Sequence, residues 1–450
     1  MRRISHDRNM TEGVIWKQLL LFFVPILFGS LFQHLYSTVD AIIVGQYAGK
    51  EGLAAIDSTG TMTRLFINFF VGVSSGATIL ISQQYGAKND MDVSRSVHTG
   101  IAFSLCGGAI LAVLGVLLTP LGTRLVGVPL DIEGPARDYL YLSFACMLPS
   151  MVYNMGAGIL RAVGDSKRPL YYLLASSLVN IALDLLFVAV LPWGVIGAGL
   201  ATLIAQILSA VLVLAALMRE KEPVRLSWRR VRMESSVLRK VLRTGLPIGL
   251  QSSMYPLANT IVRASINRLG TNVIAAWAVC GKLDFVIWVA IDSLAIAAST
   301  FAAQNYGAKL YARVRQGTRI CVYLSLAVIL PLSLLLYLFA EPLSRLFVAD
   351  TEVIRISGEL IRFYAPFFFT FIWGDVLSGV IRGTGETLRP MLITLLCTCV
   401  LRVVWIIAVV PLHTTIEMII GCFPLTWVVT SATFIVYHWR YSARRLHVRA

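Results

Sequence analysis

The stretch Leu170-Tyr-Tyr-Leu-Leu-Ala-Ser-Ser-Leu-Val-Asn-Ile-Ala-Leu-Asp-Leu-Leu-Phe-Val-Ala-Val-Leu191 is apolar at nearly every position. At about 1.5 Å per residue, a helix of this length crosses a bilayer core of about 30 Å. Asn180 and Asp184 are four residues apart and therefore share one helical face. A carboxylate at bilayer depth costs about 2.5 to 3.5 kcal/mol and tends to face protein, water or an ion. The pair is our leading candidate for a functional site. The alternative is a helix-helix hydrogen bond made by Asn180, with Asp184 near the membrane interface.

The composition places the whole chain in a membrane. Of 450 residues, 57% are hydrophobic and 14% are charged, and the mean hydropathy is +0.75. A soluble domain carries about 25% charged residues. Twelve apolar runs are long enough to span a bilayer, and none shows the alternation of a membrane barrel. We therefore predict an all-α membrane protein with twelve transmembrane helices.

The positions of the basic residues predict the orientation of the chain. The net charge is +15, and with both termini inside, 28 of the 39 Lys and Arg fall in cytoplasmic segments. The positive-inside rule then predicts a multi-pass membrane protein with both termini in the cytoplasm. This charge faces membrane lipids, and we expect no nucleic-acid partner.

An internal repeat organises the twelve helices into two halves. The segment Gln84-Tyr-Gly-Ala-Lys88 recurs 221 residues later as Asn305-Tyr-Gly-Ala-Lys309. The segment from Gly158 to Pro169 recurs at the same offset from Gly379 to Pro390. Six helices per half give both halves the same orientation, so they are parallel repeats. We expect an N-lobe at 1–217, a cytoplasmic linker at 218–243, a C-lobe at 244–438 and a basic tail at 439–450.

Two local features suggest how the chain bends. Pro25 lies within the first apolar run, where it removes a backbone hydrogen bond and permits either a moving bend or a fixed kink. The two Tyr-Gly-Ala-Lys segments are expected to be structural turns in which the glycine takes a positive φ. The linker is long enough to let two helical bundles move apart and together.

The remaining membrane-embedded polar residues extend the candidate site. Asp40 and Thr202 lie at a depth similar to that of Asp184, judged from the loop residues Gly45, Pro192 and Gly194. Two carboxylates, an amide and a hydroxyl suit a proton or a hard monovalent cation.

The same positions in the second half differ. At the repeat offset Asp40 falls on Ile261 and Asp184 on Trp405, which favours a specialised site in the first half. Asp375 is the residual candidate for a second site. Lys282 with Asp284, and the arginines Arg263 and Arg402 of the second half, indicate intramembrane pairing more than a transport pathway.

The sequence offers little support for an enzyme or a metal site. The seven cysteines all lie in apolar runs and are most simply small core residues. Cys397 and Cys399 lack the spacing of a metal site, and neither His34 nor His98 has a ligand partner at helical spacing. We expect no catalytic residues, no bound metal and no cofactor.

These features together resemble one transporter family. Asp40-Ala-Ile-Ile-Val-Gly45, Leu53-Ala-Ala55, the two Tyr-Gly-Ala-Lys segments and Leu160-Arg-Ala-Val-Gly-Asp165 are similar to the pattern of MATE (multidrug and toxic compound extrusion) proteins. The resemblance extends over about residues 12 to 438 and is strongest to the DinF-type branch. It implies a V-shaped pair of six-helix lobes that exports lipophilic, often cationic, compounds in exchange for H⁺ or Na⁺.

The resemblance also implies roles for individual residues. The DinF-type cation-coupling positions fall on Asp40, Asn180, Asp184 and Thr202, and further pocket positions fall on Tyr139 and Asn154. The chain departs from the NorM-type branch because no acidic residue occurs between Glu234 and Asp284, so Asp375 is the remaining acidic candidate in the second half.

We therefore expect a monomeric secondary antiporter that works by alternating access. The alternative is a lipid-linked oligosaccharide flippase of the same superfamily.

Overall fold

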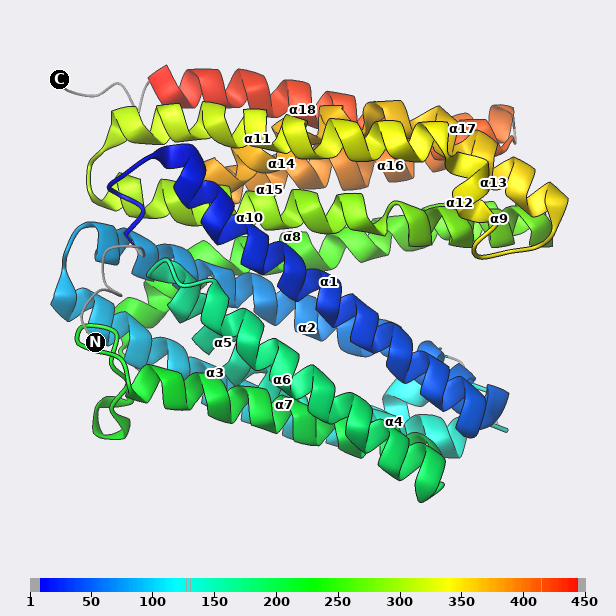
Figure 1. The fold of residues 1–450 in the computed structure, drawn as a ribbon, viewed down its shortest axis with the longest axis horizontal. Helices are drawn as coiled ribbons and strands as arrows, with labels where there is room; N and C mark the ends of the chain where they lie inside the picture. Colours follow the sequence, from blue (N-terminus) through cyan, green and yellow to red (C-terminus); the bar gives the residue numbers. More distant parts are fainter. Residues whose placement is uncertain (1–8, 127, 130, 414, 444–450) are drawn as a thin grey trace. The chain divides into compact units, whose positions relative to one another are not determined.

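A computed structural model of the chain describes residues 9–126, 128–129, 131–413 and 415–443. Its regular elements in that part are all helical (Figure 1). The chain divides into two compact units. Unit 1 contains Val24–Gly249, and unit 2 contains Met10–Phe23 together with the chain from Leu250 onward.

Unit 1 holds the helices of the first half. They are α1 (Ile15–Tyr47, from Val24 onward), α2 (Gly49–Gly86), α3 (Asp90–Val126), α4 (Glu133–Ala145), α5 (Met147–Ala162), α6 (Lys167–Asp184), η1 (Leu185–Val190), α7 (Gly194–Met218) and η2 (Trp228–Arg230). Within this unit α5 packs against α2, α3 and α7, and α6 packs against α7.

Unit 2 holds the helices of the second half, in which several spans are broken into pieces. They are α8 (Ser235–Ile266, from Leu250 onward), η3 (Asn267–Leu269), α9 (Thr271–Leu283), α10 (Phe285–Gly307), α11 (Tyr311–Leu338), α12 (Ala340–Ser344), α13 (Thr351–Tyr364), η4 (Ala365–Phe367), α14 (Phe368–Gly383), α15 (Leu388–Thr394), η5 (Leu395–Val400), α16 (Leu401–Val404), η6 (Trp405–Val409), η7 (Val410–Leu412), α17 (Ile416–Ile420) and α18 (Cys422–Tyr441). Here α14 packs between α10 and α18, and α11 lies beside α10.

The predicted all-α membrane fold is confirmed. Eleven helical stretches in the described part are long and apolar enough to cross a membrane. The twelfth is α8, which is 32 residues long and more polar than the others. In the predicted tail at 439–450, α18 continues to Tyr441, and residues 444–450 lie outside the described part.

The internal repeat is visible in the backbone. Positive φ angles recur at the 221-residue offset: 74° at Gly49 with 103° at Gly270, and 88° at Gly164 with 93° at Gly385. Glycine suits these positions because it has no Cβ. The two halves therefore share their turns as well as their helices.

The Tyr-Gly-Ala-Lys segments differ from our expectation in one respect. Their positive φ angles belong to the lysines, at 54° for Lys88 and 60° for Lys309, and not to the glycines. Each lysine N–H donates to the carbonyl of the segment's tyrosine at 3.0 Å, which closes the last turn of α2 or α10. The glycine before it is still helical, so the left-handed residue comes two positions later than we predicted.

The first helix of each half changes unit along its length. The border falls between Phe23 and Val24 inside α1, next to Pro25, and between Gly249 and Leu250 inside α8, close to Pro247. Each unit is therefore completed by the start of the helix that continues into the other unit.

The start of the chain is tied to unit 2 by hydrogen bonds to its backbone. The Met10 N–H donates to Gln304 Oε1 at 3.0 Å, and Asn305 Nδ2 donates to the Met10 carbonyl at 3.1 Å. Arg313 Nη2 donates to the Glu12 carbonyl at 2.9 Å. These contacts hold the segment before α1 on the helices next to the second Tyr-Gly-Ala-Lys turn.

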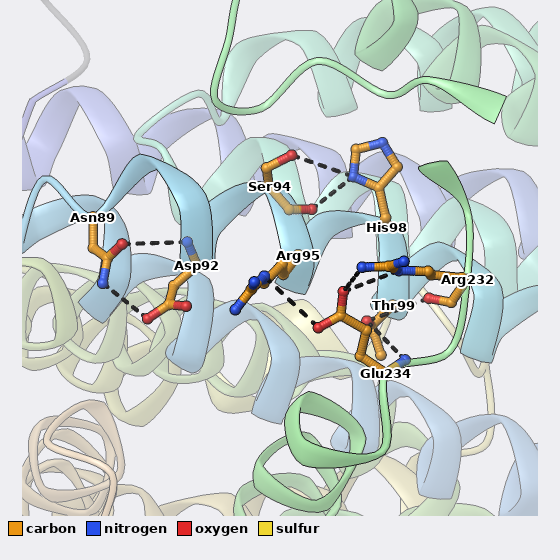
Figure 2. A network of polar contacts seen from close by, with 8 residues as sticks. All are labelled: Asn89, Asp92, Ser94, Arg95, His98, Thr99, Arg232 and Glu234. Atoms are coloured by element: carbon orange, nitrogen blue, oxygen red, sulfur yellow. Dashed lines mark hydrogen bonds and ion pairs between the residues drawn. The ribbon is translucent and has the colours of Figure 1, made fainter. Parts of the chain in front are cut away.

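The linker before α8 is docked on unit 1 and is not a free tether (Figure 2). The Ser227 N–H donates to His98 Nε2 at 3.1 Å, so in this arrangement the ring carries its proton on Nδ1. Nδ1 donates to the Ser94 carbonyl at 2.6 Å. Thr99 Oγ1 accepts from the Glu234 N–H at 3.4 Å. Val224 and Leu226 are buried in the apolar core that surrounds Ile101.

We predict that His98→Phe loosens this linker. The substitution keeps the ring volume but leaves the Ser227 N–H without an acceptor, at a cost of about 1 to 3 kcal/mol. We expect faster trypsin cleavage at Arg229 and Arg230 in the purified protein. Ser94→Ala is the matched control because its hydroxyl lies 3.5 Å from the ring. Equal cleavage rates for the two variants would contradict the docking role.

A close contact between α2 and the start of α8 depends on glycine. A Cβ on Gly76 would lie 2.4 Å from the Gly245 Cα, and one on Gly72 would lie 2.5 Å from the Gly249 Cα. No side chain fits between backbones at these distances. The two glycine pairs therefore let the helices touch.

We predict that Gly76→Leu severely destabilises the protein, because the new side chain meets backbone that cannot move aside. Overpacking of this kind costs about 1 to 3 kcal/mol or more. Thermal unfolding followed by size-exclusion chromatography measures the loss. Gly281→Leu is the control, since a Cβ there has nothing within 4 Å. Equal melting temperatures for the two variants would refute the close packing.

Candidate cation-coupling site

The predicted pair Asn180 and Asp184 lies in the core of unit 1. Asp184 is the last residue of α6, and its exposed fraction is 0%, while that of Asn180 is 1%. A π-helical segment, η1, follows Asp184 directly. Such segments are frequent at functional sites because the wider turn re-aims nearby side chains. The sequence prediction that this face points into protein is consistent with the burial.

Asp40 of α1 reaches the same place. Its carboxyl group and that of Asp184 lie close enough to share a hydrogen bond when one of them carries a proton. In the described residues, no donor binds Asp40 Oδ1, either oxygen of Asp184 or the amide of Asn180. Buried polar atoms are normally paired, so this group is short of a proton or a cation.

Tyrosine side chains lie within electrostatic range of the two carboxyl groups. Tyr36 of α1 interacts electrostatically with Asp40 and Asp184, and Tyr139 of α4 interacts with Asp40. Tyr36 was not among the residues that we selected from the sequence. Its position four residues before Asp40, on the same helical face, was the signal that could have identified it.

Two further predicted residues lie on neighbouring helices. Thr202 is half-buried on α7, and no hydrogen bond among the described residues joins it to either carboxyl group. Asn154 of α5 donates to the Ser150 carbonyl at 2.9 Å and lines a small pocket with Phe70, Val71 and Met151. The structure therefore brings Asp40, Asp184 and Tyr139 together and places Asn154 at a pocket of the same unit.

Pro25 lies inside a continuous α1, so the helix does not end there. Its importance comes from its place beside the border between the units. The helix-one bend that we predicted from the sequence thus coincides with the point at which α1 leaves unit 2.

Unit 2 contains a second pair of membrane carboxyl groups, on the half-buried Asp375 and the exposed Asp292, that sequence reasoning did not pair. Asp375 of α14 interacts with Asp292 of α10, and Arg382 lies close to both. At the repeat offset these two acids correspond to Asn154 and Val71, which line the pocket of unit 1.

The comparison with protein families decides what kind of protein this is. The MatE family profile matches residues 25–186 and again residues 247–407. The chain belongs to the MATE family. The two matched segments follow the internal repeat, so each half of the chain carries one copy of the family's unit.

Individual relatives agree with this assignment. The probable multidrug resistance protein YoeA of Bacillus subtilis is 30% identical over 395 residues, which cover 86% of this chain and 85% of that protein. DNA damage-inducible protein F (DinF) of Escherichia coli is 25% identical over 369 residues, which cover 80% and 79% of the two chains.

The comparison with solved structures shows the same fold. The solved structure of a multidrug resistance MATE family transporter in an outward-facing conformation matches with a TM-score of 0.91 at 21% identity. The match covers 98% of this chain and 99% of the other. MATE proteins are multi-pass membrane transporters of small molecules; they are not enzymes and need no cofactor.

Proposed function

We propose that this MATE protein is a secondary antiporter that exports lipophilic, often cationic, compounds in exchange for H⁺ or Na⁺. The coupling ion binds in unit 1 at Asp40, Asn180, Asp184 and Thr202. Tyr139 and Asn154 line the adjoining substrate pocket. Alternating access follows from binding the ion and the substrate in turn.

The contact between the Asp40 and Asp184 carboxyl groups carries this proposal. Two adjacent ionised carboxylates in a medium of low dielectric repel one another and lose their hydration. A shared proton, or a sodium ion bound to the carboxylate and amide oxygens, removes both costs. Because the acids come from different helices, occupation of the site changes the packing of α1 against α6. Such a differential interaction is what ion-driven switching requires.

The substrate class is supported by the relatives and by the site. YoeA is named a probable multidrug resistance protein. Buried carboxyl groups beside tyrosines suit organic cations, which bind aromatic faces and negative charge. A substrate cation and the coupling ion would then compete for the same acidic group, which is the simplest route to exchange.

The distribution of basic residues supports a membrane location and an orientation for the transporter. The basic cytoplasmic segments support a bacterial inner-membrane protein with both termini inside, in contact with anionic lipids, that works as a single chain. The relatives reported above give no support to a lipid-linked oligosaccharide flippase.

Transport into inverted membrane vesicles tests the proposal. A fluorescent organic cation such as ethidium is supplied outside, and either a pH gradient or a Na⁺ gradient is imposed separately. We expect uptake that depends on one of the two gradients and collapses when that gradient is dissipated. Uptake that neither gradient drives would refute ion-coupled antiport.

A further inference from the structure

Arg402 of α16 is a buried cation that forms no ion pair with a carboxylate of the described residues. Its exposed fraction is 1%, and it lies within a predicted membrane span of unit 2. Nη1 donates to Asn259 Oδ1 at 2.6 Å, and Nη2 donates to Thr426 Oγ1 at 3.1 Å. Nε has no hydrogen-bond partner among the described residues. The intramembrane ion pair that the sequence suggested for this arginine is therefore not observed in the part of the chain that the structure describes.

The acidic residues described in unit 2 form no ion pair with this arginine. Asp292 and Asp375 interact with each other and with Arg382. None of the ion pairs between described residues includes Arg402. A charged side chain buried in a membrane protein is costly and usually marks a partner or a pathway. The missing partner is thus an anion.

An aromatic wall lies directly beside the guanidinium. The Arg402 side chain stacks on the Phe423 ring, with 4.4 Å from Cζ to the ring centroid. The Phe423 ring is 5.4 Å from Trp277 and 6.0 Å from Trp427, centroid to centroid. Aromatic rings favour stacked or edge contacts with other rings at such distances. A cation at the edge of this wall suits a ligand that joins an aromatic ring to an acidic group.

Two residues that contact Arg402 are themselves accessible. Asn259 is exposed on α8, and Phe423 is only half-buried. An anionic oxygen that replaces the Asn259 amide would accept a charge-assisted hydrogen bond, which is roughly twice as strong as a neutral one. The partnerless Nε offers a further donor.

The internal repeat allows the position of Arg402 to be compared with its equivalent in unit 1. At the 221-residue offset Arg402 corresponds to Ile181, the neighbour of Asn180, and Asp184 corresponds to Trp405, whose Nε1 donates to the Met418 carbonyl at 2.8 Å. The helix that ends with the acidic Asp184 in unit 1 thus carries a buried basic group in unit 2.

We propose that Arg402, with Asn259, Thr426 and the aromatic wall at Phe423, forms a subsite for the carboxylate or sulfonate of an aromatic organic anion. The transporter then accepts amphiphilic acids as well as organic cations. This subsite lies in unit 2 and does not depend on the coupling site proposed in unit 1.

Equilibrium binding to the purified full-length protein, without any ion gradient, tests the subsite. The probes are 2-naphthalenesulfonate and its neutral analogue 2-naphthalenesulfonamide, compared by titration calorimetry. We expect at least a ten-fold preference for the sulfonate in the wild-type protein and no preference in Arg402→Gln. Arg263→Gln, which removes an exposed arginine of α8, should keep the preference. Equal affinity of the wild type for the two probes would overturn the proposal.

A second variant keeps the test valid if Arg402→Gln does not fold. Asn259→Asp places a carboxylate 2.6 Å from the guanidinium at constant side-chain size, so it satisfies the buried charge from within. We expect a folded protein that has lost the ten-fold preference for the sulfonate. A preference that persists in this variant would show that Arg402 is not the anion-binding group. Because no ion gradient is used, these results are independent of whether ion-coupled antiport occurs.

Discussion

Replacing Asp184 by Asn abolishes drug export while the protein still reaches the membrane; this is the largest effect that we expect from any single substitution. The change keeps the shape of the side chain but removes its charge, so the pair with Asp40 can no longer alternate between a proton-bound and a proton-free state. We expect Asp40→Asn to have the same effect, because neither acid can repel a neutral partner. Both variants are measured by drug resistance in cells and by ethidium uptake into inverted vesicles.

Asp375→Asn is the matched control for this experiment. Asp375 is also a membrane carboxyl group with a carboxyl neighbour, but it is half-buried and lies in unit 2 close to Arg382. We expect it to reduce transport less than Asp184→Asn does at equal expression. Wild-type export by both unit 1 variants would show that Asp40 and Asp184 do not form the coupling site. Equal losses in Asp184→Asn and Asp375→Asn would mean that unit 2 also couples.

The helices and their repetition could be read from the sequence because each depends on local pattern. Hydrophobic run length predicts membrane spans. Gly164 and Gly385, which the repeat offset relates in the sequence, both have positive φ angles in the structure. The polar residues at bilayer depth were conspicuous for a similar reason: in an apolar run, a single Asp184 stands out. Burial of Asn180 and Asp184 required only that the helix turn its polar face inward.

The features that the sequence did not predict depend on contacts between distant segments. The docking of the linker on His98, the link from Met10 to Gln304 and the pairing of Asp292 with Asp375 join residues that are dozens to hundreds of positions apart. Their side chains gave no periodic signal. Our prediction of the positive φ angle in the Tyr-Gly-Ala-Lys segments was wrong for a different reason. Glycine is the usual left-handed residue, and the segment contains one, so we assigned the positive φ to the glycine and not to the lysine.

Protonation of Asp40 is expected to move α1 about Pro25. The beginning of α1 belongs to unit 2, where the preceding residues are held by Arg313 and its neighbours, whereas the part that carries Asp40 belongs to unit 1. Pro25 lies next to this border and has no N–H for the Leu21 carbonyl, so the helix resists bending least at this point. A neutral Asp40 can approach Asp184 and donate a hydrogen bond, which pulls one part of α1 towards α6 while the other part stays fixed.

Spin labels at Leu35 of α1 and Leu178 of α6, both exposed on unit 1, report this movement. We expect their distance distribution to shift between mildly alkaline and acidic pH in parallel with transport. Asp40→Asn should hold the acidic distance at every pH.

Pro25→Ala restores the missing hydrogen bond of α1 and should lower transport roughly ten-fold, which corresponds to about 1.4 kcal/mol. The opposing view is that Pro25 is a fixed kink and that protonation acts through charge alone. Distances that stay constant while transport changes with pH would leave only that electrostatic mechanism, because a helix that does not move cannot transmit the state of Asp40 from one unit to the other.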